Sequence, residues 1–465
     1  MCTSTQLDEN ICRILLYRND ATELLLETTP GGLGVPVLPV PTRTRIAEEI
    51  TAAINSAWGL DTYCMFSLPG GAHSFAPTPC QVVEVCRPGT STLAGMHWVP
   101  VASLSASSFE HSDAFEVIQT SLATLDQYRC GELQGAFGKP GWLTVVTDWV
   151  RAEATAVDLS LTGKFRQFNA SPTFSLIRFE TNGPAVWFKA TGEPNLHELT
   201  ITVSLTRLFP GYLPPILGVN SLWNAWLSEE ISNTTLERFT ELSVWERVAE
   251  NLAELQIASI GKCCALFDNQ CRDLRLSKLI DLIPPFLTRV AEFMAAQQKQ
   301  PPPPLTIREL AFLGERLQEA ISVLQDFGFP ETLGHIDFNP GNILITPARC
   351  VFLDWAEACV THPFTTFEYL AEHFRRSGIR DAGGCNRVAP AYLRPWRSFL
   401  SSEELTRTMA VSPLVAVFSY AIAGNAWRSP DALHNSLEAG FLRSLARRMH
   451  SEANRLPDRG VRCSA

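Results

Sequence analysis

The sequence is poor in charge, has no cysteine pair of the C-x-x-C type and contains no long apolar run. Charged residues make up 18% and hydrophobic residues 46% of its 465 residues, which excludes a disordered chain and allows a sizeable core. The formal net charge of −10 excludes nucleic-acid binding through a general basic field. Without C-x-x-C spacing among the 13 cysteines, a thiolate zinc cluster is excluded too. We expect most thiols to be small buried hydrophobes.

Targeting and membrane signals are also missing. Apolar runs such as residues 414–423 are about half as long as a membrane span, so we expect no transmembrane helix. The first residues lack a basic start followed by an apolar core, so we expect no secretory signal and a cytoplasmic protein. At roughly 150 residues per domain, the length predicts about three folding units.

Residues 1–150 have a mixed pattern of α and β signals. The expected elements are a strand pair at residues 11–17 and 22–27 and helices at residues 44–58 and 112–125. Gly59 follows the first helix, as a C-terminal stop does. Gly and Pro in residues 131–141 indicate a linker. We therefore expect a first domain at residues 1–150 and a second at residues 151–465.

The second domain has a strand-rich pattern in its first part and a helical pattern in its second part. Short strands at residues 173–179 and 185–190, joined by an Asn-Gly turn, predict a hairpin, and residues 195–208 predict a helix. Two more strands are expected at residues 215–219 and 224–231. Beyond residue 242 the pattern is mainly helical. The sequence therefore predicts a small β-rich lobe at about 160–235 and a large helical lobe at about 236–465.

The segment with the clearest chemical signal is residues 334–345. Its Asn-Pro-Gly turn lies between apolar runs, so it displays polar groups on an anchored loop. Asp337 and Asn342 flank this turn, and Asp354 follows a short strand at residues 350–353. Such hard oxygen donors suit Mg²⁺, which takes few protein ligands and binds substrate phosphates. Singly, each of the three has a simpler explanation as a turn or helix cap; together, at this spacing, they favour a site.

The pattern H-x-D-x-x-x-x-N at residues 335–342, followed by Asp354, resembles the catalytic pattern of eukaryotic-like kinases. In detail it is similar to the aminoglycoside phosphotransferase and choline kinase-like branch, over roughly residues 160–375. The resemblance implies a two-lobed protein kinase-like α+β fold. It implies that Asp337 is the catalytic base and that Asn342 and Asp354 hold Mg²⁺ on ATP, the co-substrate. His335 is expected to organise the loop by hydrogen bonding.

The resemblance also implies a nucleotide site in the small lobe. Lys189, at the end of an apolar strand, is expected to bind the α- and β-phosphates. Its expected helix partner is Glu198, although Asn195 and Glu198 also form a capping-box sequence, and Glu193 is the alternative.

The sequence departs from the family pattern at three places, and two main-chain contacts to the nucleotide are also expected. The phosphate-covering loop at residues 169–172, which includes Ser171, has no glycine, which puts nucleotide affinity in doubt. The adenine is expected to bind main chain near Glu230 and Ile231. Asn339 stands where many relatives carry histidine, and Ala356 where protein kinases carry glycine, which argues against a regulated protein kinase.

The first domain resembles a Nudix domain in the order of its elements, from residues 15–27 through the helix with Glu48 and Glu49 to residues 97–101. The carboxylate cluster that binds Mg²⁺ in Nudix hydrolases is absent after Ala53. We therefore expect a degenerate, α/β Nudix-like scaffold, with its two glutamates on a solvated helix face.

The combined expectation is an ATP-dependent small-molecule kinase that transfers the γ-phosphoryl group to a hydroxyl, with a small hydroxyl-bearing acceptor and neither nucleic acid nor membrane as partner. Two alternatives remain: a catalytically weak nucleotide-binding regulatory protein, and a Nudix hydrolase with a kinase-like appendage. Glu357 and Glu368 are candidates for binding a cationic acceptor and are equally well explained as surface residues.

Overall fold

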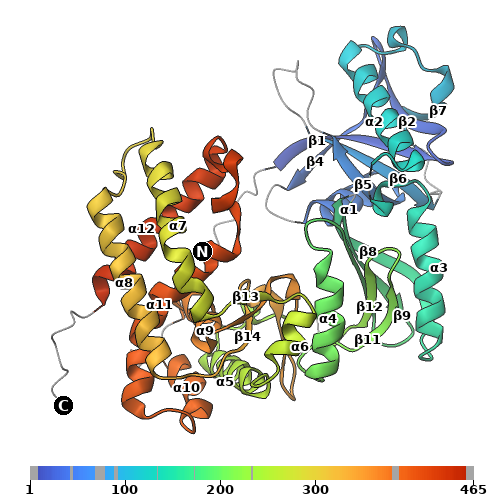
Figure 1. Ribbon diagram of the computed structural model, residues 1–465. Coiled ribbons are helices and arrows are strands. Elements are labelled where there is room, and N and C mark those ends of the chain that lie inside the picture. Colours follow the sequence, from blue (N-terminus) through green and yellow to red (C-terminus); the bar gives the residue numbers. More distant parts are fainter. Residues whose placement is uncertain are drawn as a thin grey trace, which may run out of the picture. The chain divides into compact units, whose positions relative to one another are not determined.

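The computed structural model describes residues 9–41, 45–68, 79–87, 93–133, 135–171, 173–231, 234–379 and 387–456 (Figure 1). The chain forms two compact units rather than the three that its length suggests. Unit 1 comprises residues 1–199 and 215–230, and unit 2 comprises residues 200–214 and 231–465. The expected division near residue 150 stays a prediction.

The first sheet of unit 1 has seven strands in the order β3-β2-β1-β6-β5, with β4 paired to β1 and β7 paired to β2. Its strands are β1 (Glu9–Arg18), β2 (Glu23–Thr29), β3 (Gly32–Gly34), β4 (Val37–Pro41), β5 (Asp61–Leu68), β6 (Cys80–Arg87) and β7 (Met96–Pro100). The antiparallel pairing of β1 with β2 confirms the predicted strand pair. A parallel pairing of β1 with β6 makes the sheet mixed.

Three helices accompany this sheet: α1 (Ile46–Trp58), α2 (Ser112–Cys130) and α3 (Trp142–Thr155). Ala47, Ile50 and Ile54 recur at helical spacing on α1 and are buried. Gly59 then adopts a left-handed φ of 66° and ends the helix, as the sequence predicts. Within residues 131–141, expected to be a linker, Phe137 is buried in the core of unit 1.

The second sheet of unit 1 has five strands in the order β11-β12-β10-β9-β8. They are β8 (Leu161–Ser171), β9 (Phe174–Thr181), β10 (Val186–Thr191), β11 (Ile216–Asn220) and β12 (Ala225–Glu229). The pairing of β9 with β10 confirms the predicted hairpin, and β11 and β12 confirm the two later strands. Strand β10 is the central strand, so its residues have neighbours on both sides.

The two sheets of unit 1 share one hydrophobic core. Tyr17 and Phe66 from the first sheet, Trp142 from α3 and Phe188 from the second sheet belong to the same buried cluster. The Trp142 and Phe188 rings lie 6.3 Å apart. This continuity explains why the structure has fewer compact units than the length predicts.

A buried side chain also joins the two sheets through main-chain atoms. The Gln167 amide on β8 accepts a hydrogen bond from the Cys64 main-chain nitrogen at 2.8 Å and donates one to the Cys64 oxygen at 2.9 Å. Nearby, Arg166 forms an ion pair with Glu48 of α1. Glu48, expected on a solvated helix face, is half-buried and paired with an arginine far along the sequence.

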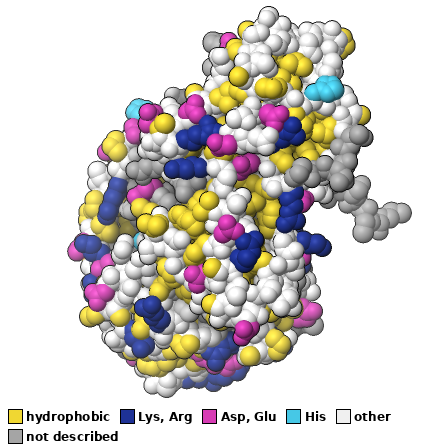
Figure 2. All heavy atoms as spheres, turned by 90° about the vertical axis from the view of Figure 1, so that its right-hand side faces the viewer, with side chains coloured by type: hydrophobic (Ala, Val, Ile, Leu, Met, Phe, Trp, Pro, Cys, Tyr) yellow, Lys and Arg dark blue, Asp and Glu magenta, His cyan; other side chains and the backbone are white. Residues whose placement is uncertain are grey.

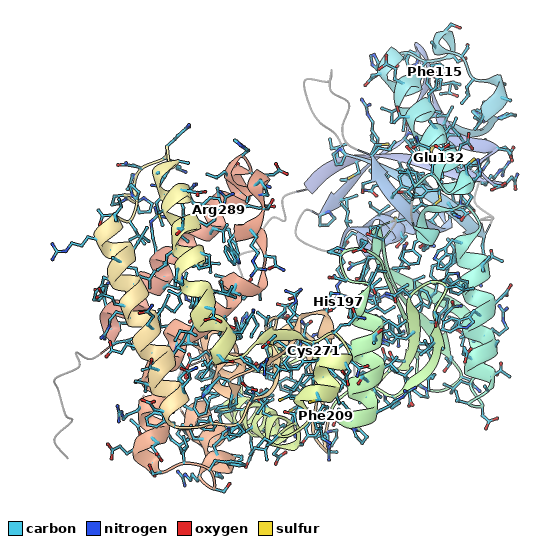
Figure 3. All side chains as sticks on the ribbon, in the orientation of Figure 1. Phe115, Glu132, His197, Phe209, Cys271 and Arg289 are labelled. Atoms are coloured by element: carbon cyan, nitrogen blue, oxygen red, sulfur yellow. The ribbon has the colours of Figure 1, made fainter. Side chains whose placement is uncertain are left out.

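Unit 2 is mainly helical. Its helices are α5 (Leu242–Ala258), α6 (Cys263–Asp268), α7 (Leu276–Ala295), α8 (Ile307–Asp326), α9 (Pro363–Arg376), α10 (Val388–Trp396), α11 (Ser402–Ala423) and α12 (Ser436–Arg455). Helix α4 (His197–Leu208) confirms the predicted helix at 195–208 and passes from unit 1 into unit 2 after Leu199. Figure 3 labels its first residue, His197, and Phe209, which follows it and is buried in unit 2.

Five short strands complete unit 2: β13 (Arg272–Leu274), β14 (Thr332–His335), β15 (Ile343–Ile345), β16 (Cys350–Phe352) and β17 (Ala358–Thr361). They form a three-stranded sheet, β13-β17-β14, and the hairpin β15-β16. One core cluster surrounds these strands with α5, α9 and α10. A second core cluster lies among α7, α8, α11 and α12, which Figure 1 shows packed together.

The apolar run at residues 414–423 belongs to α11. This helix has 22 residues and is, by length and hydropathy alone, apolar enough to cross a membrane. In the most apolar 18-residue segment of this helix, 61% is buried inside the protein, as expected of a core helix.

The cysteines follow the sequence-based expectation, and one face of the molecule shows mixed charges. On the face that Figure 2 shows, basic and acidic side chains are interspersed. Among the described cysteines, six are buried: Cys12, Cys64, Cys80, Cys271, Cys350 and Cys359. Burial raises the pKa of the Cys64 thiol to about 12, so this group stays protonated and behaves as a small hydrophobe.

Candidate active site

The polar loop of unit 2 is held between strands at both ends. Strand β14 ends at His335, the loop follows, and the 3-10 turn Pro340–Asn342 leads into β15. Ile336, Phe338 and Ile343 are buried on either side of the exposed Asp337. Apolar anchors therefore fix the loop and turn its polar residues outward, as the sequence predicts.

Gly334 permits the close packing of β14 at the start of this loop. A Cβ atom at Gly334 would lie 2.4 Å from the Thr361 side chain and 2.9 Å from the Cys359 sulfur. Both contacts are too short for a side chain, so only glycine fits here. The sequence motif includes this glycine, but its role depends on β17, a strand that comes later in the chain than the whole loop.

His335 links two parts of the site and is almost completely buried. Its Nδ1 accepts a hydrogen bond from the Asp337 main-chain nitrogen at 3.1 Å. An Nδ1 acceptor in a neutral imidazole requires the proton on Nε2, which lies 3.0 Å from the Leu353 carbonyl oxygen and donates to it. These contacts fit the expected loop-organising role of His335.

The Asp337 carboxylate receives hydrogen bonds from two side-chain amides. Asn339 Nδ2 donates to its Oδ1 at 3.1 Å, and Asn342 Nδ2 donates to its Oδ2 at 3.3 Å. Asn339 Oδ1 in turn accepts from the Gly341 main-chain nitrogen at 3.0 Å. The turn therefore orients this carboxylate through neutral amide donors.

Asn342 and Asp354 lie at the same end of the β15-β16 hairpin. The Leu353 main-chain nitrogen donates to the Asn342 main-chain oxygen at 2.8 Å. This hydrogen bond continues the strand pairing one position beyond the pair of Ile343 and Phe352. Asp354 follows directly, with a left-handed φ of 63° that Asp tolerates better than most residues. Because Asn342 turns its amide nitrogen to Asp337, its amide oxygen is the atom suited to a metal. The two residues expected to bind Mg²⁺ are thus brought together.

A cavity of about 310 Å³ opens beside Asp337 within unit 2. Ile336, Asp337 and Glu357 line it from the loop side, and Tyr420 lines it from α11. The rest of its lining is apolar or glycine: Ala421, Ala423, Gly424, Ala426, Phe441, Leu442 and Leu445. Burial and the nearby carboxylates of Asp337 and Glu357 raise the pKa of the Tyr420 hydroxyl, so this group stays protonated and can donate.

The two acidic residues considered for a cationic acceptor differ in position. Glu357 lines the cavity, and its carboxylate lies 3.0 and 3.1 Å from the Arg272 guanidinium. Glu368 does not line this cavity and is 5% exposed on α9, so it is neither a surface residue nor an acceptor ligand there. Burial raises its pKa to about 7.

In unit 1, the expected lysine and its helix partner meet. Lys189 Nζ on β10 lies 2.5 Å from Glu198 Oε1 in the first turn of α4. Both side chains are well buried, and the ammonium also lies over the rings of Phe174 and Trp226, at 5.5 and 5.6 Å from their centroids. The sequence left Glu198 open between a cap and a partner, and the structure brings it to Lys189.

The other residues expected at the nucleotide lie at strand ends. Ser171 ends β8, and its Oγ accepts a hydrogen bond from the Thr173 main-chain nitrogen at 3.2 Å; Pro172 lies outside the described residues. The Glu230 carboxylate pairs with Arg178 at 2.7 Å and accepts from Trp187 Nε1, so its side chain faces the sheet. Ile231 is exposed and begins the return of the chain to unit 2.

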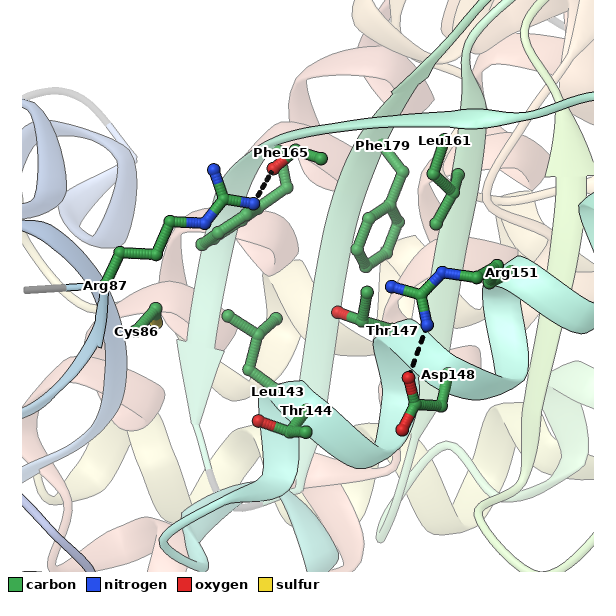
Figure 4. A pocket seen from close by; sticks show the side chains of 11 residues that line it. Cys86, Arg87, Leu143, Thr144, Thr147, Asp148, Arg151, Leu161, Phe165 and Phe179 are labelled. Carbon is green, nitrogen blue, oxygen red and sulfur yellow. Dashed lines mark hydrogen bonds and ion pairs between the residues drawn. The ribbon is translucent and has the colours of Figure 1, made fainter.

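A smaller cavity of about 160 Å³ lies in unit 1 between α3 and the strands around it (Figure 4). Its two arginines are engaged: Arg87 donates to the Gly163 carbonyl at 2.6 Å, and Arg151 pairs with Asp148 at 2.5 Å. Both arginines that line this cavity therefore already have partners within unit 1.

Comparison with known proteins finds a similarity that includes the loop region. The sequence model of the phosphotransferase enzyme family matches residues 223–392, which include Asp337, Asn342 and Asp354. No curated protein sequence matches the chain.

Solved structures similar to this chain share little sequence with it. An aminoglycoside 2'-phosphotransferase-IIIa in complex with GDP is 16% identical, with a TM-score of 0.45, and the match covers 66% of this chain and 98% of that one. The ethanolamine kinase of Plasmodium vivax is 14% identical, with a TM-score of 0.44 and coverage of 70% and 93%. A macrolide 2'-phosphotransferase from Brachybacterium faecium is 16% identical, with a TM-score of 0.42 and coverage of 63% and 97%. The match to the phosphotransferase enzyme family is therefore limited to residues 223–392 of this chain.

Proposed function

We propose that this protein transfers the γ-phosphoryl group of ATP to a hydroxyl group of a small molecule. The observation that carries the proposal is the Asp337 carboxylate, which two amides orient and which lines a cavity of about 310 Å³. Clefts of this size are typical of small-ligand sites. The family match over this loop supports the same reaction class.

Asp337 is the base in this proposal. The hydroxyl of the acceptor donates to the carboxylate, which receives its proton as the oxygen bonds to the γ-phosphorus. The bond from that phosphorus to the bridging oxygen breaks, and its electron pair leaves on ADP. The contribution of the chain is to position the acceptor, because Asn339 and Asn342 hold the carboxylate in one orientation.

Asn342 and Asp354 are the proposed Mg²⁺ ligands. An amide oxygen and a carboxylate are hard donors of the kind Mg²⁺ prefers, and two protein ligands suffice for an ion that also takes phosphate oxygens and water. When bound, the ion neutralises charge on the phosphates. In the described part of the chain, no group of three or more His, Cys, Asp or Glu side chains could hold a metal, so a separate structural metal has no support there.

Lys189 is the proposed phosphate ligand in unit 1, with Glu198 holding its ammonium in place. Ser171 and the main chain at Glu230 and Ile231 are the further nucleotide contacts that the family resemblance implies.

We also propose that the first sheet of unit 1 is a degenerate Nudix-like scaffold without hydrolase activity. Its support is the ion pair between Glu48 and Arg166, which takes up a carboxylate in a helix that already lacks the metal-binding cluster.

The proposal is tested by thermal unfolding with ATP, in Mg²⁺ and in EDTA. ATP is expected to raise the melting temperature more with Mg²⁺, because a ligand that binds only the folded state stabilises it. Asp354→Ala should abolish this difference, and the matched variant Asp281→Ala, at an exposed position on α7, should retain it. An unchanged Mg²⁺-dependent shift in folded Asp354→Ala would remove this residue from the metal site, and no shift in the wild type would contradict the proposed function.

A further inference from the structure

The cavity beside Asp337 is bounded largely by apolar side chains. Ala421, Leu442 and Leu445 are buried and belong to the core formed by α7, α8, α11 and α12. Phe441 is half exposed and forms an edge-on contact with Tyr420, with ring centroids 6.1 Å apart. A ligand that fills this space replaces water with hydrocarbon contacts over most of its surface, which favours an apolar body.

The charged groups that line the cavity also favour an uncharged ligand. Glu357 is the carboxylate that could hold a ligand cation away from the reacting hydroxyl, and Arg272 contacts both of its oxygens. The same guanidinium donates to the Ala423 carbonyl oxygen at 2.6 Å, which fixes it against the end of α11. In the part of the chain that the structure describes, Asp337 is the remaining lining carboxylate, and its neighbours are neutral amides.

A hydroxyl bound at Asp337 leaves the rest of the acceptor against apolar walls, and the other lining carboxylate among the described residues, Glu357, is already paired with Arg272. A cation there would lose its hydration without receiving a paired charge, which is costly. The Tyr420 hydroxyl supplies a neutral donor at the same wall.

We propose that the acceptor is a compact, uncharged alcohol with an apolar body, whose hydroxyl binds at Asp337, rather than a cationic amino alcohol or a polycation. The inference rests on the proposed phosphotransferase function and names the substrate class of that cavity. The acceptor oxygen forms the new bond to the γ-phosphorus, its proton passes to Asp337, and ADP departs with the electrons of the broken P–O bond.

The test uses two isosteric acceptors that differ in charge, 3,3-dimethylbutan-1-ol and choline, with kanamycin as the polycation. Transfer of labelled γ-phosphate from ATP is measured with the full chain and Mg²⁺. The inference predicts a kcat/KM at least about tenfold higher for the neutral alcohol than for choline, and no transfer to kanamycin. A preference for choline or kanamycin would overturn the substrate class and leave the phosphotransferase function standing.

Transfer to none of the three compounds would also overturn the inference, whereas the function itself is judged by the Mg²⁺-dependent ATP shift and its loss in Asp354→Ala.

Two variants then test which residues determine the preference for the neutral alcohol over choline. Arg272→Gln frees Glu357 as a counter-ion and should lower the preference for the neutral alcohol over choline about tenfold or more; a folded variant with an unchanged preference would contradict the role of the ion pair.

The second variant keeps the test decisive if Arg272→Gln does not fold. Phe441→Ala should raise the KM of the neutral alcohol and leave that of ATP unchanged, because Phe441 lines the cavity. Leu437→Ala, one turn earlier on α12 and 83% exposed, is the matched control and should change neither. Equal effects of the two α12 variants on the alcohol KM would place the acceptor elsewhere and overturn the inference.

Discussion

His335 Nε2 lies 3.0 Å from the carbonyl oxygen of Leu353, which joins the loop of the proposed base to the residue before Asp354. The same ring accepts from the Asp337 main-chain nitrogen. One buried side chain therefore couples the position of the base to that of a proposed metal ligand. This relationship supports a positioning role for His335, which takes no part in proton transfer in the proposed reaction.

The His335→Ala variant is expected to lower kcat while the protein stays folded. The change leaves the half-buried Leu353 carbonyl and the Asp337 main-chain nitrogen without these partners, at a cost of up to about 1–3 kcal/mol for each group, and lets the loop shift. Kinetics and thermal unfolding check this expectation, with His434→Ala, at an exposed position, as the control. A fully active His335→Ala enzyme would show that the link is dispensable.

Lys189→Ala is expected to weaken ATP binding about 10- to 100-fold, because a charge-assisted contact to phosphate contributes about 1.5–3 kcal/mol. Lys164→Ala, an exposed lysine of the same sheet, should bind ATP like the wild type. Titration calorimetry with ATP and Mg²⁺ measures both. If the two variants bind ATP equally well, Lys189 is a structural partner of Glu198 and not a phosphate ligand.

Gln167→Ala is expected to destabilise unit 1 by about 3 kcal/mol, because the buried Cys64 main-chain nitrogen and oxygen lose their hydrogen bonds to the Gln167 amide. Denaturant unfolding gives the loss, and Gln119→Ala on the exposed side of α2 serves as the control. A loss within about 0.5 kcal/mol, the range of an ordinary surface substitution, would mean that water replaces the amide. The two sheets would then be joined only by their shared apolar core.

Local patterns were enough to predict several elements of unit 1 and the mainly helical character of unit 2. Apolar residues such as Ile50 and Ile54 predict α1 by their spacing, and the strand-turn-strand pattern that includes Lys189 predicts the β9-β10 hairpin. These signals depend on neighbours within a few residues. The union of two sheets in one core was not predicted, because Gln167 and Cys64 lie 103 residues apart.

The site was predictable to the extent that its parts are close in sequence. Asp337 and Asn342 lie in one loop, and the hairpin brings Asp354 beside them. The cavity wall from α11 and α12 could not be predicted, since those helices begin only at Ser402 and Ser436, far beyond the motif. The pairing of Glu357 with Arg272 was hidden for the same reason.

Stability is expected to depend on pH through Glu368. Burial raises its pKa from 4.5 to about 7, so folding favours the protonated form, and the free energy of unfolding falls as pH rises from about 4.5 to about 7. The Arg375 guanidinium lies 3.7 Å from the Glu368 carboxylate and opposes this rise in pKa. The carboxylates of Glu452 and Glu372 add to the rise, and Tyr392 of α10 also faces Glu368.

The Glu368→Gln variant should therefore be more stable than the wild type at pH 8, by up to about 3 kcal/mol, and the gain should shrink at pH 5. His362, whose pKa burial lowers to about 3, responds to pH equally in both proteins. Denaturant unfolding at the two pH values measures the difference. The same gain at both would show that it comes from packing and not from the buried charge.

The central claim is most directly tested by Asp337→Asn, assayed for transfer of labelled γ-phosphate from ATP to the best acceptor of the three compounds. The account predicts that kcat falls by about 10²- to 10⁴-fold, because the amide cannot accept the hydroxyl proton, while the ATP dissociation constant changes less than about threefold. Asp281→Asn is the control. An Asp337→Asn enzyme with wild-type kcat, or one that loses ATP binding and keeps its rate with bound substrate, would contradict the assignment of Asp337 as the base.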